Sequence, residues 1–190
     1  MLRSAGRRLR RIIRKGPRTR RLIEAMFDVE PEFWPLHHAC RDTTLTSAER
    51  LYALYKAVEY VSARKIPGDF VECGVWRGGS VMMMALALQR FGAVGRKLHC
   101  FDTFEGMAEP GPQDIRADSG QSAAEQFAEI EAREGKRSWA AAALDLVRGN
   151  IGKTGYPPEL IAYCKGKVEE TLPGRRAGAD RAAASRHRLV

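Results

Sequence analysis

The sequence predicts an α/β fold with a parallel sheet, because helix and strand patterns alternate along the chain. Three short runs read as strands, at residues 69–75, 97–101 and 159–164. Stretches with helical spacing of apolar residues lie between them. The length of 190 residues corresponds to one domain that can bury a sizeable core.

The first long helix is expected at 46–64. Glu49 lies three residues after Thr46, which is the spacing of a capping box. Apolar residues then recur at helical intervals and form one stripe: Leu51, Leu54, Tyr55, Val58 and Val61. Pro67 and Gly68 stop the helix. Before it, Pro31 and Pro35 are expected to break any helix in residues 22–45.

The segment ECGVWRGGS, residues 72–80, joins the first strand to a helix at 80–90. A strand that runs through a flexible turn into a helix directs backbone N–H groups at one point, next to the positive end of the helix dipole. Three glycines allow a ligand to approach the backbone, and Ser80 is a candidate helix cap: the glycines are Gly74, Gly78 and Gly79. An ordinary tight turn remains the alternative.

The second strand ends at Asp102, which lies 24 residues after Gly78. In doubly wound folds, an acid about 20 residues after the glycine loop binds ribose hydroxyls. The glycine loop and Asp102 together predict a ligand that contains a nucleoside. The alternative for Asp102 is that it only forms a turn. Glu72 would repel a pyrophosphate but suits a positive amino or sulfonium group, so S-adenosylmethionine fits better than NAD.

The second half of the chain continues the alternation. A loop rich in glycine, proline and acids follows Asp102, and helices are expected at 122–134 and 138–148. The third strand, at 159–164, ends at Lys165 and Gly166.

The net charge of +9 comes from the two ends of the chain. Residues 1–21 hold ten basic residues and no acid, residues 174–190 have a net charge of +4, and residues 22–173 have a net charge of −5. We therefore expect a basic, disordered arm, a folded body and a basic tail. A basic arm attracts nucleic acid or anionic lipid, but the acidic body argues against nucleic acid as the main partner.

The composition narrows the class of protein further. No apolar run approaches the roughly 20 residues of a membrane span, and the arm lacks the apolar core of a signal peptide. The four cysteines lie far apart and form no CxxC pair, which favours a reduced, cytoplasmic setting and no zinc site.

The segments VECGVWRGGS and LHCFDTFEGM, taken together, resemble the macrocin O-methyltransferase (TylF-type) family. The likeness continues through Asn150, TGYP at 154–157 and KGKVEETLP at 165–173, and it covers about residues 40–173. It implies a Rossmann-like class I methyltransferase sheet that uses S-adenosylmethionine to methylate a sugar hydroxyl of a natural product. By resemblance, the cofactor contacts are Glu72, Gly74, Gly78, Gly79, Ser80 and Asp102.

The resemblance stops after residue 173. The family continues with a fourth strand and a motif LDTDW, whose acids are expected to bind a divalent metal, Mg²⁺, and to act as general base. Residues 174–190 lack it, so we assign no catalytic or metal-binding residue in this chain. A one-base shift in a compatible coding sequence would restore LDTDW. We therefore expect a frameshift-like, non-native tail, a sheet truncated after about three strands, and an inactive enzyme.

Three functions follow from these patterns. The first is a metal-dependent sugar O-methyltransferase, truncated here, with a sugar or glycoside as acceptor. The second is a protein that binds S-adenosylmethionine without catalysis, or a partner subunit. The third is a nucleic-acid-binding protein led by the arm. The sequence leaves homo-oligomerisation and the identity of the acceptor open.

Overall fold

The computed structural model describes residues 29–107, 109–116, 119–134 and 140–172. The chain divides into two compact units, Met1–Pro35 and Leu36–Val190, and the sheet belongs to the second. The expected arm at 1–21 and tail at 174–190 lie outside the described residues.

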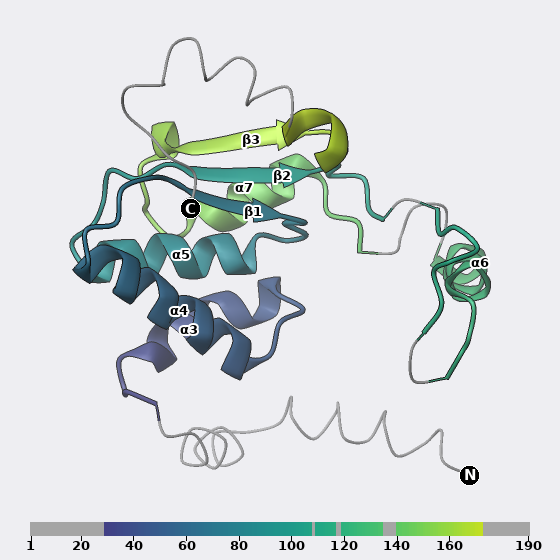
Figure 1. Ribbon diagram of the computed structural model, residues 1–190, viewed down its shortest axis with the longest axis horizontal. Helices are drawn as coiled ribbons and strands as arrows, with labels where there is room; N and C mark the ends of the chain where they lie inside the picture. Colours follow the sequence, from purple (N-terminus) through teal and green to yellow (C-terminus); the bar gives the residue numbers. More distant parts are fainter. Residues whose placement is uncertain (1–28, 108, 117–118, 135–139, 173–190) are drawn as a thin grey trace. The chain divides into compact units, whose positions relative to one another are not determined.

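In the described residues, three parallel strands form the sheet, in the order β1-β2-β3 (Figure 1). They are β1 (Phe70–Cys73), β2 (Leu98–Asp102) and β3 (Ile161–Lys165). In the register, Glu72 lies opposite Cys100, and Cys100 lies opposite Tyr163. The α/β class and the parallel sheet of three strands are therefore confirmed, with strand ends within about two residues of the expected ones.

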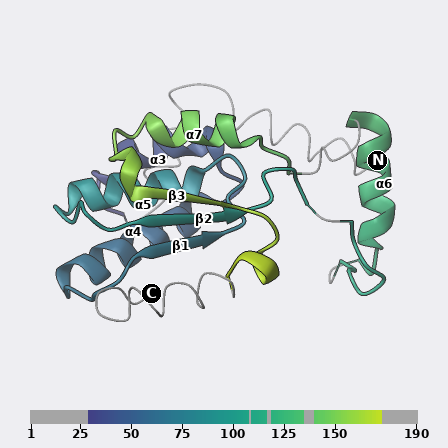
Figure 2. The same cartoon turned by 90° about the horizontal axis from the view of Figure 1, so that it is seen from above.

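The three helices that cover the sheet lie on the same face of it, as the two cartoon views show (Figures 1 and 2). They are α4 (Ala48–Ala63), α5 (Gly79–Arg90) and α7 (Leu144–Gly152). The middle helix, α5, contacts α4, α7 and β2. It is apolar on almost every side, and eight of its residues are buried, which is why it forms the centre of the core.

The helix α4 follows most of the expected stripe, because Leu51, Tyr55, Val58 and Val61 are buried, while Leu54 is partly exposed. Its start differs from the expectation. Ser47, not Thr46, occupies the N-cap, and it makes no side-chain capping bond to the backbone. Packing of its buried apolar face stabilises this helix more than capping of its N-terminus does.

The expectation that Pro31 and Pro35 break any helix in residues 22–45 is wrong. The helix α3 (Phe33–Cys40) contains Pro35. Proline is tolerated there because it lies in the first turn, where the backbone N–H has no partner within the helix.

The remaining elements are the 3₁₀ turns η1 (Arg41–Thr43) and η2 (Pro158–Leu160) and the helix α6 (Ala123–Glu134). The expected helix at 138–148 is displaced, since α7 runs from Leu144 to Gly152 and residues 140–143 are not helical. Val147 and Ile151 are fully buried, and this packed face determines where α7 lies. Within the described residues, no helix is long and apolar enough to cross a membrane.

Candidate functional site

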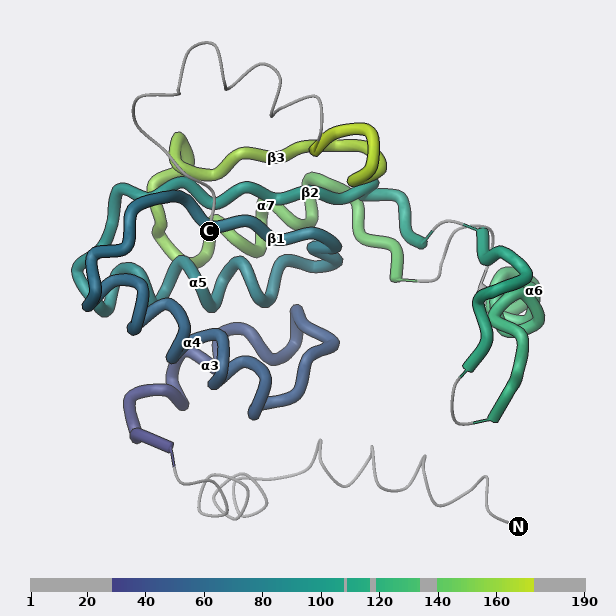
Figure 3. The backbone as a smooth tube through the Cα atoms, in the orientation of Figure 1, coloured from purple at the N-terminus to yellow at the C-terminus, as the bar shows by residue number. Residues whose placement is uncertain are grey.

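The loops that follow the three strands meet at the carboxyl edge of the sheet, as the backbone trace shows (Figure 3). The loop after β1 is residues 74–78, and the loop after β2 begins at Thr103. Ligands of open α/β sheets bind at this edge. All six residues predicted to contact the cofactor lie on these loops or at the adjoining ends of β1, β2 and α5.

Asp102 connects the loops through its side chain and its main chain. The N–H groups of Val75 and Trp76 donate to its Oδ2 atom, at 2.6 and 3.1 Å. The N–H of Phe104 donates to Oδ1 at 2.7 Å. Its backbone carbonyl accepts from the N–H of Gly166, after β3, at 3.0 Å. Asp102 therefore takes part in a turn, as the alternative interpretation required, and also binds the glycine loop.

Two bulky residues at the site have left-handed backbone conformations. Trp76 has φ +47° and Phe104 has φ +55°. Such values are uncommon for residues other than glycine, asparagine and aspartate, and they persist where the surroundings hold them. Both N–H groups donate to Asp102, so this carboxylate holds the strained residue of each loop.

The three glycines of the loop differ in what surrounds them. At Gly74, which has φ +84°, a Cβ atom would meet nothing within 4 Å. At Gly78, the N-cap of α5 with φ +91°, a Cβ would lie 3.1 Å from Ile151. At Gly79 it would lie 2.5 Å from Cβ of Thr44. Only Gly74 of the three presents a surface open to a ligand. The positive φ angle accounts for glycine at position 78, and close packing accounts for it at position 79.

Glu72 is a largely buried carboxylate on the helix-covered face of the sheet. Burial raises its pKa from 4.5 to about 6, and a hydrogen bond with Ser80 lowers the pKa in part. The expected capping role of Ser80 is wrong, because Gly78 is the N-cap and Ser80 is the second residue of α5. Ser80 instead turns toward Glu72, which fixes this carboxylate beside the N-terminus of the helix.

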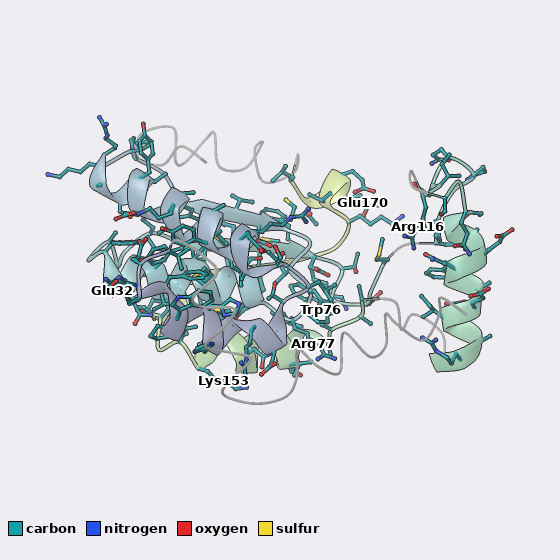
Figure 4. The ribbon with its side chains drawn as sticks, turned by 90° about the horizontal axis from the view of Figure 1, so that it is seen from below. Glu32, Trp76, Arg77, Arg116, Lys153 and Glu170 are labelled. Atoms are coloured by element: carbon teal, nitrogen blue, oxygen red, sulfur yellow. The ribbon has the colours of Figure 1, made fainter. Side chains whose placement is uncertain are left out.

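Asn150 supports the loop from α7, a role that the sequence did not indicate. Its Nδ2 atom donates to the backbone carbonyl of Arg77 at 3.1 Å, and its Oδ1 atom accepts from Nζ of Lys153 at 3.1 Å. The guanidinium of Arg77 lies 4.8 Å from the ring centre of Trp76, and the two side chains lie together in Figure 4. Asn150 is 73 residues from Arg77, so no local pattern predicts this contact. The sequence indicates Asn150 only through the family resemblance.

A cavity of about 630 Å³ lies between the loop after β2 and α6. The loop after β2 lines it with Thr103 and Glu105, and α6 lines it with Phe127. Nζ of Lys165, at the end of β3, lies 2.9 Å from Oε1 of Glu105, which links this loop to the third strand.

The described part of the chain contains no group of three or more His, Cys, Asp or Glu residues placed to hold a metal ion. These residues therefore do not fit the Mg²⁺ that the resemblance implies, and none of them is assigned a role in metal chemistry. What they offer is a buried carboxylate, an open glycine and a helix N-terminus at one edge of the sheet.

A parallel sheet with a glycine loop after its first strand and an acid at the end of its second is the arrangement found in α/β proteins that bind nucleoside-containing cofactors. Residues 23–182 of the chain match the macrocin O-methyltransferase (TylF) family. The chain belongs to this family, and its members, as their names state, are O-methyltransferases.

Two curated relatives specify the family's chemistry. The chain is 36% identical over 135 residues to 8-demethyl-8-(2,3-dimethoxy-alpha-L-rhamnosyl)-tetracenomycin-C 4'-O-methyltransferase of Streptomyces olivaceus, covering 71% of this chain and 48% of that protein. It is 28% identical over 130 residues to demethyldecarbamoylnovobiocin O-methyltransferase of Streptomyces niveus, covering 68% and 46%. The chain thus spans about half the length of these relatives.

Two solved structures share the fold. The O-methyltransferase NovP superposes with a TM-score of 0.55 at 27% identity, over 69% of this chain and 50% of NovP. The calicheamicin methyltransferase CalS11 superposes with a TM-score of 0.53 at 16% identity, over 88% and 65%, which supports the fold alone. The methyltransferase sheet expected from the resemblance is confirmed.

Proposed function

We propose that this chain forms the S-adenosylmethionine-binding part of an O-methyltransferase that acts on a sugar hydroxyl of a natural product. The observation that carries the proposal is Glu72, a largely buried carboxylate beside an open glycine at the edge of the sheet. Family membership supports S-adenosylmethionine as the cofactor, and the name of the 36%-identical relative supports a sugar acceptor.

Each residue of the proposed site has a different role in binding the cofactor. Ionised Glu72 attracts the positive amino group of the cofactor, which S-adenosylhomocysteine also carries. Gly74 lets the ligand lie against the backbone, and the first turn of α5, which begins at Gly79, offers N–H groups that lack partners within the helix. Gly78 fixes the start of that helix, Ser80 orients Glu72, and Asp102 shapes the loops around the nucleoside. S-adenosylmethionine, when bound, supplies the methyl group.

The acceptor in this proposal is a sugar or glycoside, and the cavity next to the loop after β2 is where we place it. That this chain is inactive, because it lacks the Mg²⁺ ligands expected in the family, stays a prediction. The free thiols Cys40, Cys73, Cys100 and Cys164 fit the reducing cytoplasm in which we expect the protein.

Isothermal titration of S-adenosylhomocysteine into the full chain at pH 7.5 tests the cofactor assignment. We expect saturable binding that Glu72→Gln weakens about tenfold, because a charged partner is lost. Glu159→Gln is the matched control, since Glu159 is exposed on η2 at the opposite edge of the sheet. No binding to the folded wild type would refute the proposal, and equal loss in both variants would refute the role of Glu72.

The same protein tests the alternative of a binding protein without catalysis. Methyl transfer to a glycoside acceptor, with Mg²⁺ added, would establish the enzyme and would contradict both that alternative and the predicted inactivity. S-adenosylmethionine binding without methyl transfer agrees with both.

A further inference from the structure

A second cavity, of about 370 Å³, lies where α7 and η2 meet β3, and the arrangement of α7 and β3 can be followed in Figure 2. Within the described residues β3 pairs with β2 alone, so this cavity is at an edge of the sheet. None of its lining residues is a proposed cofactor contact. The cavity is lined by Arg148, Gly152, Tyr156, Pro158, Ile161 and Tyr163.

The two aromatic walls of the cavity are held by contacts outside it. Tyr156 is 3% exposed, and its hydroxyl donates to the backbone carbonyl of Arg96 at 2.7 Å, which fixes the position of the ring. The ring of Tyr163 meets the ring of buried Phe104 edge-on, with 6.3 Å between the ring centres. Side chains that are fixed before binding lose little freedom when a ligand arrives. The walls therefore offer a preformed surface for an aromatic ring.

The charge of the cavity is positive, because Arg148 is the one charged residue among the six that line it. Its guanidinium lies 5.2 Å from the ring centre of Tyr163. Arg148 also approaches Asp145, with 3.7 Å between Nη1 and Oδ1, but the two side chains are 55% and 95% exposed. Exposed ion pairs of this kind are weak. A carboxylate in the cavity can replace Asp145 and accept two parallel hydrogen bonds from the guanidinium.

The hydroxyl of Tyr163 adds a second donor to the cavity. Within the part of the chain that the structure describes, this hydroxyl makes no hydrogen bond. Burial raises the pKa of Tyr163 to about 12, and the nearby Cys100 acts in the same direction, so the hydroxyl keeps its proton at pH 7. A guanidinium and a protonated hydroxyl can both donate to the oxygens of one anion.

The size of the cavity limits the ligand. Sites for small molecules range over roughly 300–1,000 Å³, and this cavity, at about 370 Å³, is near the lower end. Gly152 keeps one side of it open, because a Cβ atom at this position would meet nothing within 4 Å. A molecule of one or two rings fits such a space.

We propose that the cavity between α7 and β3 is a second ligand site, which binds a small aromatic carboxylate with its ring against Tyr156 and Tyr163 and its carboxylate on Arg148. This site is separate from the edge of the sheet where the cofactor is proposed to bind. It goes beyond the proposed methyl transfer and does not rest on it.

Isothermal titration of 1-naphthoate into the full chain tests the proposal, and we expect saturable binding to one site. The neutral analogue 1-naphthamide lacks the charge, and cyclohexanecarboxylate lacks the aromatic ring, so each should bind at least about tenfold more weakly. Saturating S-adenosylhomocysteine should change the affinity for 1-naphthoate less than about twofold. No binding of 1-naphthoate, equal binding of the three probes, or competition with S-adenosylhomocysteine would overturn the proposal.

A change of charge tests the role of Arg148. In Arg148→Gln, the affinity for 1-naphthoate should fall about tenfold while that for 1-naphthamide stays the same, since only the charged probe uses the guanidinium. Arg50→Gln is the matched control, because Arg50 is exposed on α4 and does not line the cavity. Equal affinity in Arg148→Gln and the wild type, or equal loss in the two variants, would contradict the assignment.

A change of volume tests the cavity itself. Gly152→Leu should abolish binding of 1-naphthoate, because the new side chain occupies open space at the wall. Gly149→Leu is the matched control on the same helix: a Cβ there also meets nothing within 4 Å, and Gly149 does not line the cavity. Both changes replace glycine with a better helix former, and circular dichroism checks that both variants fold. Unchanged binding in folded Gly152→Leu would show that the ligand lies elsewhere, and the proposal would be wrong.

Discussion

At the residue scale, Glu72 combines a cost to stability with a proposed role in binding. Its side chain faces the helix-covered side of the sheet, near Cys100, and burial raises its pKa to about 6. A carboxyl whose pKa is higher in the folded state than in the unfolded state destabilises the fold when it ionises. A positively charged ligand would offset this effect, and this is why we propose that the residue belongs to a binding site.

The pH dependence of stability should therefore change in Glu72→Gln. The folded-state pKa is about 6 against an ordinary value of 4.5, so the stability contribution of wild-type Glu72 is fully present below about pH 4.5 and is lost as the pH rises through 6. We expect the variant to be more stable than the wild type by about 1–2 kcal/mol at pH 7, with the difference fading toward pH 4.5. Urea unfolding at both pH values measures this, and a difference that does not vary with pH would contradict the assignment.

At the element scale, the position of α5 depends on a close approach at its first residue. Gly79 begins the helix, and a Cβ atom there would lie 2.5 Å from Cβ of Thr44 and 2.7 Å from the carbonyl oxygen of Thr43. The segment that precedes α4 thus packs directly on the N-terminus of α5. This contact, together with the packing of α4 on α5, holds the helix against the loop that carries the site.

Gly79→Ala should destabilise the protein by about 1–3 kcal/mol, because the backbone of Thr43 cannot move aside as a flexible side chain could. Gly149→Ala is the matched change on another helix, α7, where a Cβ would meet nothing within 4 Å. It should stabilise by about 0.5–1 kcal/mol, since alanine is the better helix former. Chemical denaturation compares the two, and equal effects would show that the contact at Gly79 is unimportant.

At the scale of the whole molecule, helices cover one face of the sheet in the described residues. Within these residues, β1 pairs with β2 alone. The chain spans about half the length of its curated relatives. The three loops at the carboxyl edge are joined by Asp102, so a ligand that binds there would couple to the stability of the entire sheet.

S-adenosylhomocysteine should therefore raise the melting temperature. At a ligand concentration of 100 times Kd, a site present only in the folded state gains about 2.7 kcal/mol. For a chain of 190 residues this corresponds to roughly 5–10 °C. Differential scanning fluorimetry over a ligand series measures the shift, and Glu72→Gln should need a higher concentration for the same shift. A melting temperature that does not respond to saturating ligand would contradict the cofactor proposal.

The sequence by itself determined the order of strands and helices, the glycine loop, the acid at the end of β2 and the family. These features follow from local patterns, because the spacing of apolar residues and the position of turn residues can be recognised within short segments. Strand ends and the stripe of α4 agreed with the structure for the same reason, while the start of α7 was misplaced because burial of Val147 and Ile151 decides it.

Only the tertiary structure decided what the predicted site residues contact. A Cβ atom would meet open space at Gly74 but would be too close to Thr44 at Gly79. Thr44 lies 35 residues before Gly79, so the sequence of the loop does not reveal this difference. The carboxylate of Asp102 is directed to backbone N–H groups that lie 26 and 27 residues earlier in the chain. Contacts between distant segments depend on how the helices and strands pack, and no local pattern of residues specifies that packing.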